Sequence, residues 1–85
     1  MPLKYEVTGY DRRTGRLSVS YDVPVKSVAE VKRIAGIPPS DDGLGSYPLD
    51  ATQVANIASA LRTEIGPEDC DYFLEPYEEE PARSR

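Results

Sequence analysis

The residues of this chain that could do chemistry gather in one stretch near its end, Asp-Cys-Asp-Tyr-Phe-Leu-Glu-Pro-Tyr-Glu-Glu-Glu over residues 69–80. A thiol among carboxylates could be a nucleophile or a metal ligand. The chain has no histidine, so it lacks the commonest general base and the commonest zinc ligand. Acidic neighbours also disfavour the reactive thiolate of Cys70, the single cysteine. We therefore expect Cys70 to be a small packed residue.

The carboxylates by themselves predict no catalytic site and no metal site. Acid–base catalysis needs carboxyl groups in different environments, whereas the three glutamates 78–80 follow one another in a polar tail. The run Asp-Asp-Gly at 41–43 resembles the start of a calcium loop. Its twelfth position, however, holds Thr52 in place of the required glutamate. We expect a turn with solvated carboxylates there, and a protein that needs no metal and no cofactor.

Length and charge limit the classes of function. Eighty-five residues predict one domain with a small core, and the net charge is −5. Residues 1–36 hold seven Lys/Arg and four Asp/Glu, whereas residues 37–85 hold three and eleven. Because the acidic half would repel a polyanion, nucleic-acid binding is disfavoured. There is no signal-peptide pattern and no apolar run long enough to cross a membrane, so we expect a cytoplasmic protein.

Three segments alternate apolar with polar residues, which predicts half-buried strands. The first covers residues 3–8 and the second residues 17–23, in which Leu17 begins the inward-facing set. The hairpin loop between them should have Gly15 in a left-handed conformation. Residues 69–75 predict the third strand, which ends at the following proline.

Two helices are predicted between the second and third strands. A serine–glutamate capping box over residues 27–30 begins a short helix, and Gly36 ends it. An aspartate–glutamine box over residues 50–53 begins a longer helix, whose apolar face continues to Ile65. Residues 38–49 between them are rich in proline and glycine, which predicts a loop.

The order strand–strand–helix–helix–strand predicts an α+β domain, with a three-stranded, mainly antiparallel sheet and both helices packed on one face. We expect the third strand to lie beside the second, in the order 1-2-3. The alternative, with the third strand beside the first and parallel to it, stays open. The compact domain should span residues 1–76, and residues 77–85 should form a flexible tail that is first acidic and then basic.

Three short motifs resemble a family of small bacterial domains of unknown function. They are the hairpin pair Tyr10-Asp11, the helix start Tyr47-Pro48-Leu49 with Gln53, and the strand Asp-Tyr-Phe-Leu-Glu at 71–75. The resemblance spans most of residues 5–75. It implies a compact, cytoplasmic, bacterial domain, and it implies no activity.

A surface for a protein partner is the leading functional hypothesis. If Tyr72 and Leu74 face the helices, Phe73 lies exposed on the bare side of the sheet among charged residues, as binding hot spots do. Acidic surfaces attract basic partners. We therefore predict a small acidic, non-catalytic protein-binding module, an immunity- or inhibitor-type partner of a basic protein. Its predicted contact residues are Asp71, Phe73, Glu75, Tyr77, Glu78, Glu79, Glu80, Asp41, Asp42 and Tyr47.

Two other functions stay open at this point. Residues 38–49 could be a lid over a small ligand or an active site, because a long loop in a small domain is often functional. The missing histidine argues against an enzyme. The chain could also be a homo-oligomeric structural unit joined through the second helix or a sheet edge, with a second copy as its partner. In each case we expect no nucleic acid and no membrane.

Overall fold

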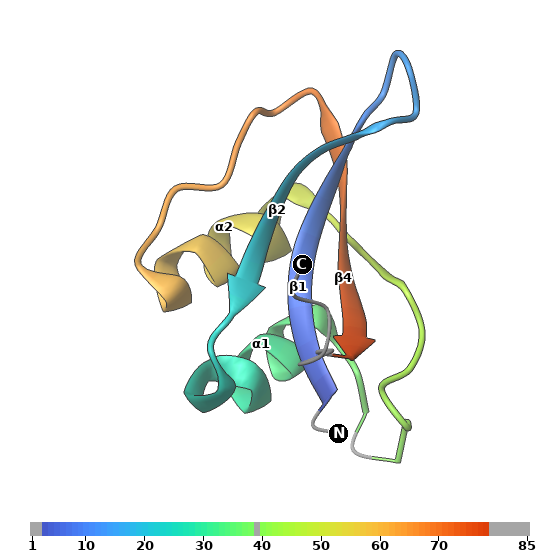
Figure 1. The fold of residues 1–85 in the computed structure, drawn as a ribbon. Helices are drawn as coiled ribbons and strands as arrows, with labels where there is room; N and C mark the ends of the chain where they lie inside the picture. The colour runs from blue at the N-terminus through green and yellow to red at the C-terminus, as the bar shows by residue number, and fades with distance from the viewer. Residues whose placement is uncertain (1–2, 39, 79–85) are drawn as a thin grey trace, which may run out of the picture.

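Two helices cover one face of an antiparallel sheet in this computed structural model, which describes residues 3–38 and 40–78 (Figure 1). The α+β class is therefore confirmed. Along the chain the elements are β1 (Leu3–Asp11), β2 (Leu17–Val23), a 3-10 turn (Val25–Ser27), α1 (Val28–Ala35), β3 (Tyr47–Leu49), α2 (Ala51–Leu61) and β4 (Cys70–Glu78). The sheet has four strands rather than the predicted three, because Tyr47–Leu49, in the predicted loop, pairs with β4.

The strand order is β2-β1-β4-β3, and all neighbours are antiparallel. The favoured order 1-2-3 is therefore wrong, whereas the alternative position beside the first strand is correct and only its parallel direction is wrong. β4 lies beside β1 rather than β2, and it runs antiparallel to β1 rather than parallel. Since β4 has the same direction as β2, an antiparallel ladder is available to it only beside β1. The short strand β3 provides the extra reversal between the helices that sets this direction.

β4 continues to Glu78, whereas we expected it to end before Pro76. A proline has no backbone N–H, and strands accept one where no neighbour needs that donor. β3 covers β4 only over Tyr72–Leu74, so Pro76 lies past the end of β3 and opposite Tyr5 of β1. Residues 77–78 of the predicted tail are thus part of the strand, and residues 79–85 lie outside the described part of the chain.

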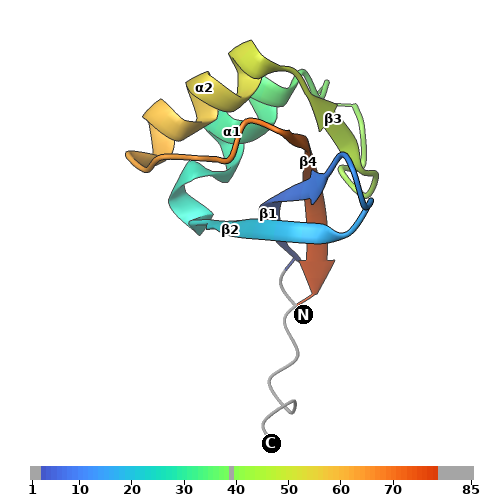
Figure 2. The same ribbon diagram turned by 90° about the horizontal axis from the view of Figure 1, so that it is seen from above.

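The core lies between the sheet and the two helices, which form a separate layer in Figure 2. Val31 of α1 and Ile57 of α2 are completely buried, as predicted from their helical spacing. On β4, Tyr72 and Leu74 are buried, so the predicted inward face of this strand is confirmed. Cys70 is 2% exposed, which confirms it as a packed residue.

The two helices differ in how well their N-termini follow the predicted capping boxes. At α2 the box is complete: the Asp50 carboxylate accepts from the Gln53 N–H, and the Gln53 side chain accepts from the Asp50 N–H, both at 2.8 Å. At α1 the predicted box is wrong. Ser27 ends a 3-10 turn in helical conformation and makes no side-chain cap, and the Val28 N–H donates to the Val25 carbonyl. The Ser27 N–H, from which the Glu30 side chain was predicted to accept, donates instead to the Pro24 carbonyl at 2.8 Å.

Two further boundaries depart from prediction. α2 ends at Leu61, four residues early, because Arg62 adopts a left-handed conformation with φ 56°. Ile65 still packs against the core from the following loop. In the N-terminal hairpin Gly15 has φ 74°, as predicted. The register between β1 and β2 shifts after Gly9, however, so Leu17 is 56% exposed rather than inward-facing.

Candidate functional site

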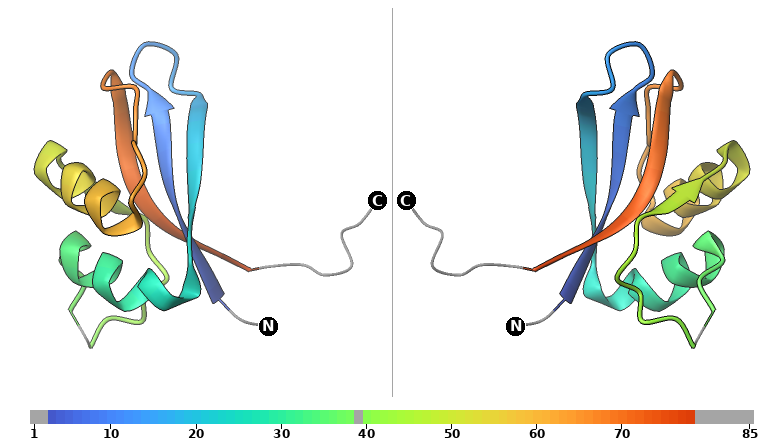
Figure 3. Two further views of the ribbon diagram at one scale, coloured as in Figure 1. Left: turned by 90° about the vertical axis from the view of Figure 1, so that its left-hand side faces the viewer. Right: turned by 90° about the vertical axis from the view of Figure 1, so that its right-hand side faces the viewer.

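The helices leave one face of the sheet uncovered, and we call it the open face (Figure 3). Three acidic residues lie side by side on this face. Glu6 of β1 is directly opposite Asp22 of β2 on one side and Glu75 of β4 on the other. Residues directly opposite in an antiparallel pair have Cβ atoms about 5 Å apart, and like charges there are destabilising. We call Asp22, Glu6 and Glu75 the acidic row.

The electrostatics of the acidic row centre on Glu6. This side chain is half-buried, and burial together with the charges of Asp22 and Glu75 raises its pKa above the ordinary value of 4.5. Each of these effects penalises the carboxylate form. A positive charge brought next to Glu6 would therefore stabilise its carboxylate and offset these penalties.

The two outer acids of the row are held in place by hydroxyl groups. Ser46 donates to Glu75 at 2.9 Å, and Tyr77 donates to Asp22 at 3.0 Å. A hydroxyl donates a hydrogen bond without adding positive charge. Asp22 and Glu75 are thus each positioned by a neutral hydrogen-bond donor.

An aromatic pair lies next to the acidic row on the same face. Tyr10 and Phe73 meet edge to face, with ring centroids 5.8 Å apart and an interplanar angle of 76°. The Tyr10 hydroxyl also donates to Glu75 at 3.5 Å. Phe73 is consequently half-buried rather than fully exposed, and Thr8 opposite it is only 2% exposed. The open face therefore has an ordered apolar patch beside its charges.

Asp71 stands at the far end of this face and is already paired. Its carboxylate accepts from Arg12 Nε at 2.9 Å, and Arg12 also donates to the Cys70 carbonyl at 3.1 Å. The hydrogen bond to Asp71 is the main cause that raises the pKa of Arg12. Of the predicted contacts, Asp71 thus shares the open face with Phe73 and Glu75, but its charge is matched by Arg12.

The structure separates three other predicted contacts from the open face. Tyr47 is opposite Leu74, on the helical side of the sheet, and its hydroxyl donates to Asp41 at 2.6 Å. This bond is the main cause that lowers the pKa of Asp41 and raises that of Tyr47. Asp42 accepts from the Leu44 N–H in the same loop. These residues tie the loop together rather than join the acidic row.

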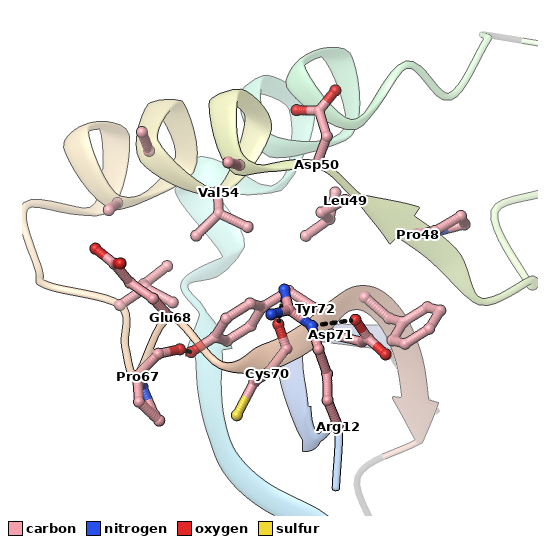
Figure 4. Close-up of a pocket in the computed structure, with 15 residues that line it drawn as sticks. Arg12, Pro48, Leu49, Asp50, Val54, Pro67, Glu68, Cys70, Asp71 and Tyr72 are labelled. Carbon is pink, nitrogen blue, oxygen red and sulfur yellow. Dashed lines mark hydrogen bonds and ion pairs between the residues drawn. The ribbon is translucent and has the colours of Figure 1, made fainter. Parts of the chain in front are cut away.

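A groove of about 600 Å³ lies between α2 and β4 (Figure 4). Its interior is mainly aliphatic and aromatic, and Arg12, Asp71 and Phe73 belong both to its lining and to the neighbourhood of the open face. The groove is thus continuous with the patch described above.

A comparison with known protein families identifies the family of this chain. A family model described as a domain of unknown function (DUF7683) matches residues 4–75. The chain belongs to this family. The match covers the whole acidic row of the DUF7683 domain, and it confirms the predicted resemblance to a small domain family of unknown function. No curated protein and no solved structure matches the chain.

The described part of this DUF7683 domain shows neither a cluster of metal-ligating residues nor a helix that could span a membrane. Within residues 3–38 and 40–78, no group of three His, Cys, Asp or Glu residues is placed to hold a metal ion. In the same residues, no helix has the length and apolar character needed to cross a membrane.

The predicted contacts Glu79 and Glu80 lie outside the described residues, and Glu78 is the last residue of β4.

Sequence reasoning missed Glu6, Asp22 and Tyr10 as members of the site. Alternation along the strands placed Glu6 and Asp22 on the uncovered side of the sheet, whereas Tyr10 belonged to the predicted hairpin loop. The expected order 1-2-3, however, puts the last strand beside the second, where Glu75 would not meet Glu6. The missing information was the strand order of this DUF7683 domain, and no local motif carries it.

Proposed function

We propose that this domain is a non-catalytic protein-binding module whose open face receives a basic segment of another protein, in an immunity- or inhibitor-type role. The observation that carries the proposal is the position of Glu6 opposite both Asp22 and Glu75. Three acids in adjacent strands repel one another, by about 0.2–1 kcal/mol for each directly opposed pair. A Lys or Arg side chain from a partner would convert that repulsion into attraction.

The aromatic pair supports the same proposal. Charged residues steer a partner and accelerate association, whereas buried aromatic contacts usually supply most of the binding energy. Tyr10 and Phe73 offer such contacts immediately beside Glu75, to which Tyr10 is bonded. The open face thus combines the two kinds of contact that a basic partner with some apolar surface would use.

The edges of the sheet support recognition by the face rather than by strand addition. A partner strand needs a row of free backbone donors and acceptors. β3 has three residues, and its central Pro48 has no N–H. Arg12 occupies the Cys70 carbonyl, which lies beyond the end of β3. On the opposite edge, the register shift at Leu17 makes β2 irregular.

The hydrogen bonds of the loop between the helices favour a protein-binding module over a small-ligand site that uses this loop as a lid. The Tyr5 hydroxyl donates to the Gly43 carbonyl at 2.9 Å, and Gly43 N–H donates to Asp41 at 2.7 Å. A lid would have to break the Tyr5–Gly43 bond and the Tyr47–Asp41 bond, which tie the loop to β1 and β3, in order to open. The homo-oligomer, the cytoplasmic location and the bacterial source stay predictions.

The test is a selection from a random-sequence peptide display library on the immobilised chain. We expect the selected peptides to be rich in Lys and Arg and to perturb the amide resonances of β1 and β4 around Glu6 and Glu75. They should bind the variant Glu6→Gln/Asp22→Asn/Glu75→Gln at least about tenfold more weakly, and their association rate should fall with salt.

A second triple variant controls for net charge. Glu30→Gln/Asp42→Asn/Glu64→Gln removes the same three charges from exposed positions away from the open face. We expect it to bind the peptides nearly as well as the original chain. Neutral selected peptides, equal losses in the two variants, or failure to select any binder would each overturn the proposal.

A further inference from the structure

The groove between α2 and β4 has an apolar interior that the protein itself does not fill. Leu49 and Tyr72 form part of its lining from the sheet, and Val54 from α2 (Figure 4). Ile65 lines it from the loop that follows α2. The groove's volume of about 600 Å³ lies within the range of pockets that bury drug-sized ligands, so it has ample room for a large side chain. Apolar surface of this kind gains free energy when it is removed from water.

The helical wall of the groove is made of small side chains. Ala51, Ala55 and Ala58 line it at helical spacing, and the first two are exposed. Alanine has little side-chain entropy to lose and no polar group to desolvate. An incoming chain can therefore approach the backbone of α2 closely on this side.

The rim of the groove is acidic. Asp50, Glu68 and Asp71 are exposed lining residues, and the one basic lining residue, Arg12, is bonded to Asp71. The net negative rim favours an occupant that carries positive charges on either side of an apolar group. The same acidic rim would repel a fatty acid or another anionic ligand.

We propose that this groove receives a single large apolar side chain, such as leucine or methionine, from the basic protein segment that binds the open face. The proposal rests on the proposed function. It is carried by continuity, because Phe73 lines the groove and also belongs to the aromatic pair of the open face. One segment can thus place its cations on the acidic row and its apolar anchor beside Phe73. The anchor gives the partner sequence specificity, which the acidic row alone would not.

Two probe peptides separate the anchor from the charges. Both are alternating Lys-Gly peptides, one with a central leucine and the other with a central serine. The serine peptide reports on the acidic surface, and the difference between the two reports on the groove. We expect the leucine peptide to bind at least about tenfold more tightly, the lower end of what burying a leucine contributes. Since Phe73 is the only phenylalanine, fluorophenylalanine labelling gives a single resonance that should move more with the leucine peptide.

A pair of tryptophan variants identifies the groove as the place of the difference. Ala55→Trp fills the groove from its exposed helical wall, whereas Ala29→Trp adds the same bulk at an exposed position of α1 that does not line it. We expect the preference for leucine to vanish in Ala55→Trp and to persist in Ala29→Trp. Thermal unfolding of both variants establishes that each is folded.

The outcomes distinguish the two proposals. Equal binding of the leucine and serine peptides overturns the anchor and leaves the basic-partner module standing. A leucine preference that survives in Ala55→Trp overturns the groove as its site. If neither peptide binds, both proposals fail together. A leucine preference without any weakening in the acidic-row variant supports the groove and overturns the acidic row as the place where the partner's charges bind.

Discussion

The ring of Tyr72 lies directly against the backbone of Gly9, its partner across the β1–β4 pair. A side-chain carbon at Gly9 would be 2.6 Å from Cε1 of Tyr72 and 2.9 Å from Cγ2 of Val19. Both distances are shorter than van der Waals contact. The glycine in the middle of β1 is thus explained by packing, since the buried tyrosine ring takes the place of a side chain.

We expect Gly9→Ala to destabilise the fold by about 1–3 kcal/mol, because overpacking forces either the Tyr72 ring or the strand to move. Urea unfolding measures the change. Gly45→Ala is the matched control, since its new carbon would lie 3.4 Å from the nearest atoms, the ring carbon Cζ and the hydroxyl oxygen of Tyr47. A Gly9→Ala variant as stable as the original chain would show that the β1–β4 contact is looser than described.

Glu6→Gln should stabilise the protein at neutral pH. The pKa of Glu6 is raised in the folded state by burial and by its acidic neighbours, so folding favours the protonated form. Its favourable contribution is complete below the unfolded value of 4.5 and is lost as the pH rises through the folded value. Glutamine keeps the shape without the charge. We expect a gain of about 0.5–1 kcal/mol at pH 7 and none at pH 3–4.

Urea unfolding at the two pH values measures the effect of Glu6→Gln, with Glu64→Gln, a change at an exposed loop residue, as its control. The control should change stability little at either pH. A Glu6→Gln variant that is less stable at pH 7 would mean that the carboxylate has a favourable partner, and would count against the acidic row as a binding site.

Alkaline unfolding should depend on Tyr72. Burial raises the pKa of its hydroxyl to about 12, and the hydroxyl donates to the Pro67 carbonyl at 2.6 Å. A raised pKa means that the neutral form is favoured by folding. Stability from this group is therefore complete below pH 10 and is lost as the pH rises through about 12.

Tyr72→Phe isolates this effect. At pH 7 the variant should be less stable by about 0.5–1.5 kcal/mol, because the Pro67 carbonyl loses its donor. Between pH 10 and 12 it should lose less stability than the original chain does. Parallel stability curves of the two proteins across this range would show that Tyr72 does not titrate with unfolding.

The sequence predicted what depends on local pattern. Alternation assigned Tyr72 and Leu74 to the buried face of β4, and the box at Asp50 and Gln53 located the start of α2. Both follow from side-chain direction and from hydrogen bonds within a few residues, so the local chain determines them. The box predicted at Ser27 was wrong because the Ser27 N–H donates to the Pro24 carbonyl of the preceding turn instead of to the Glu30 side chain.

The acidic row could not be predicted, because it depends on contacts far apart in the chain. Glu6 meets Glu75 only if β4 inserts beside β1, and that depends on the direction in which β4 enters the sheet. The direction in turn depends on β3, whose Tyr-Pro-Leu has three residues and a proline and carries almost no strand pattern. One weak element thus determined both the topology and the site.

Tyr72 and Phe73 are adjacent on β4, and we expect Tyr72 to contribute mainly to stability and Phe73 mainly to peptide binding. Tyr72→Ala removes a buried aromatic ring from the core and should cost about 3 kcal/mol or more. Phe73→Ala removes a half-buried ring whose partner is Tyr10, so it should cost about 1 kcal/mol in stability.

In peptide binding Phe73 should matter more than its small effect on stability suggests. Phe73→Ala should weaken binding of the selected basic peptides about tenfold or more, with most of the change in the dissociation rate. Unfolding curves and peptide kinetics for the two variants test this, with Tyr72→Phe as the folded reference. If Phe73→Ala unfolds the protein, or leaves peptide binding unchanged, the aromatic pair is a structural contact and the open face binds by charge alone.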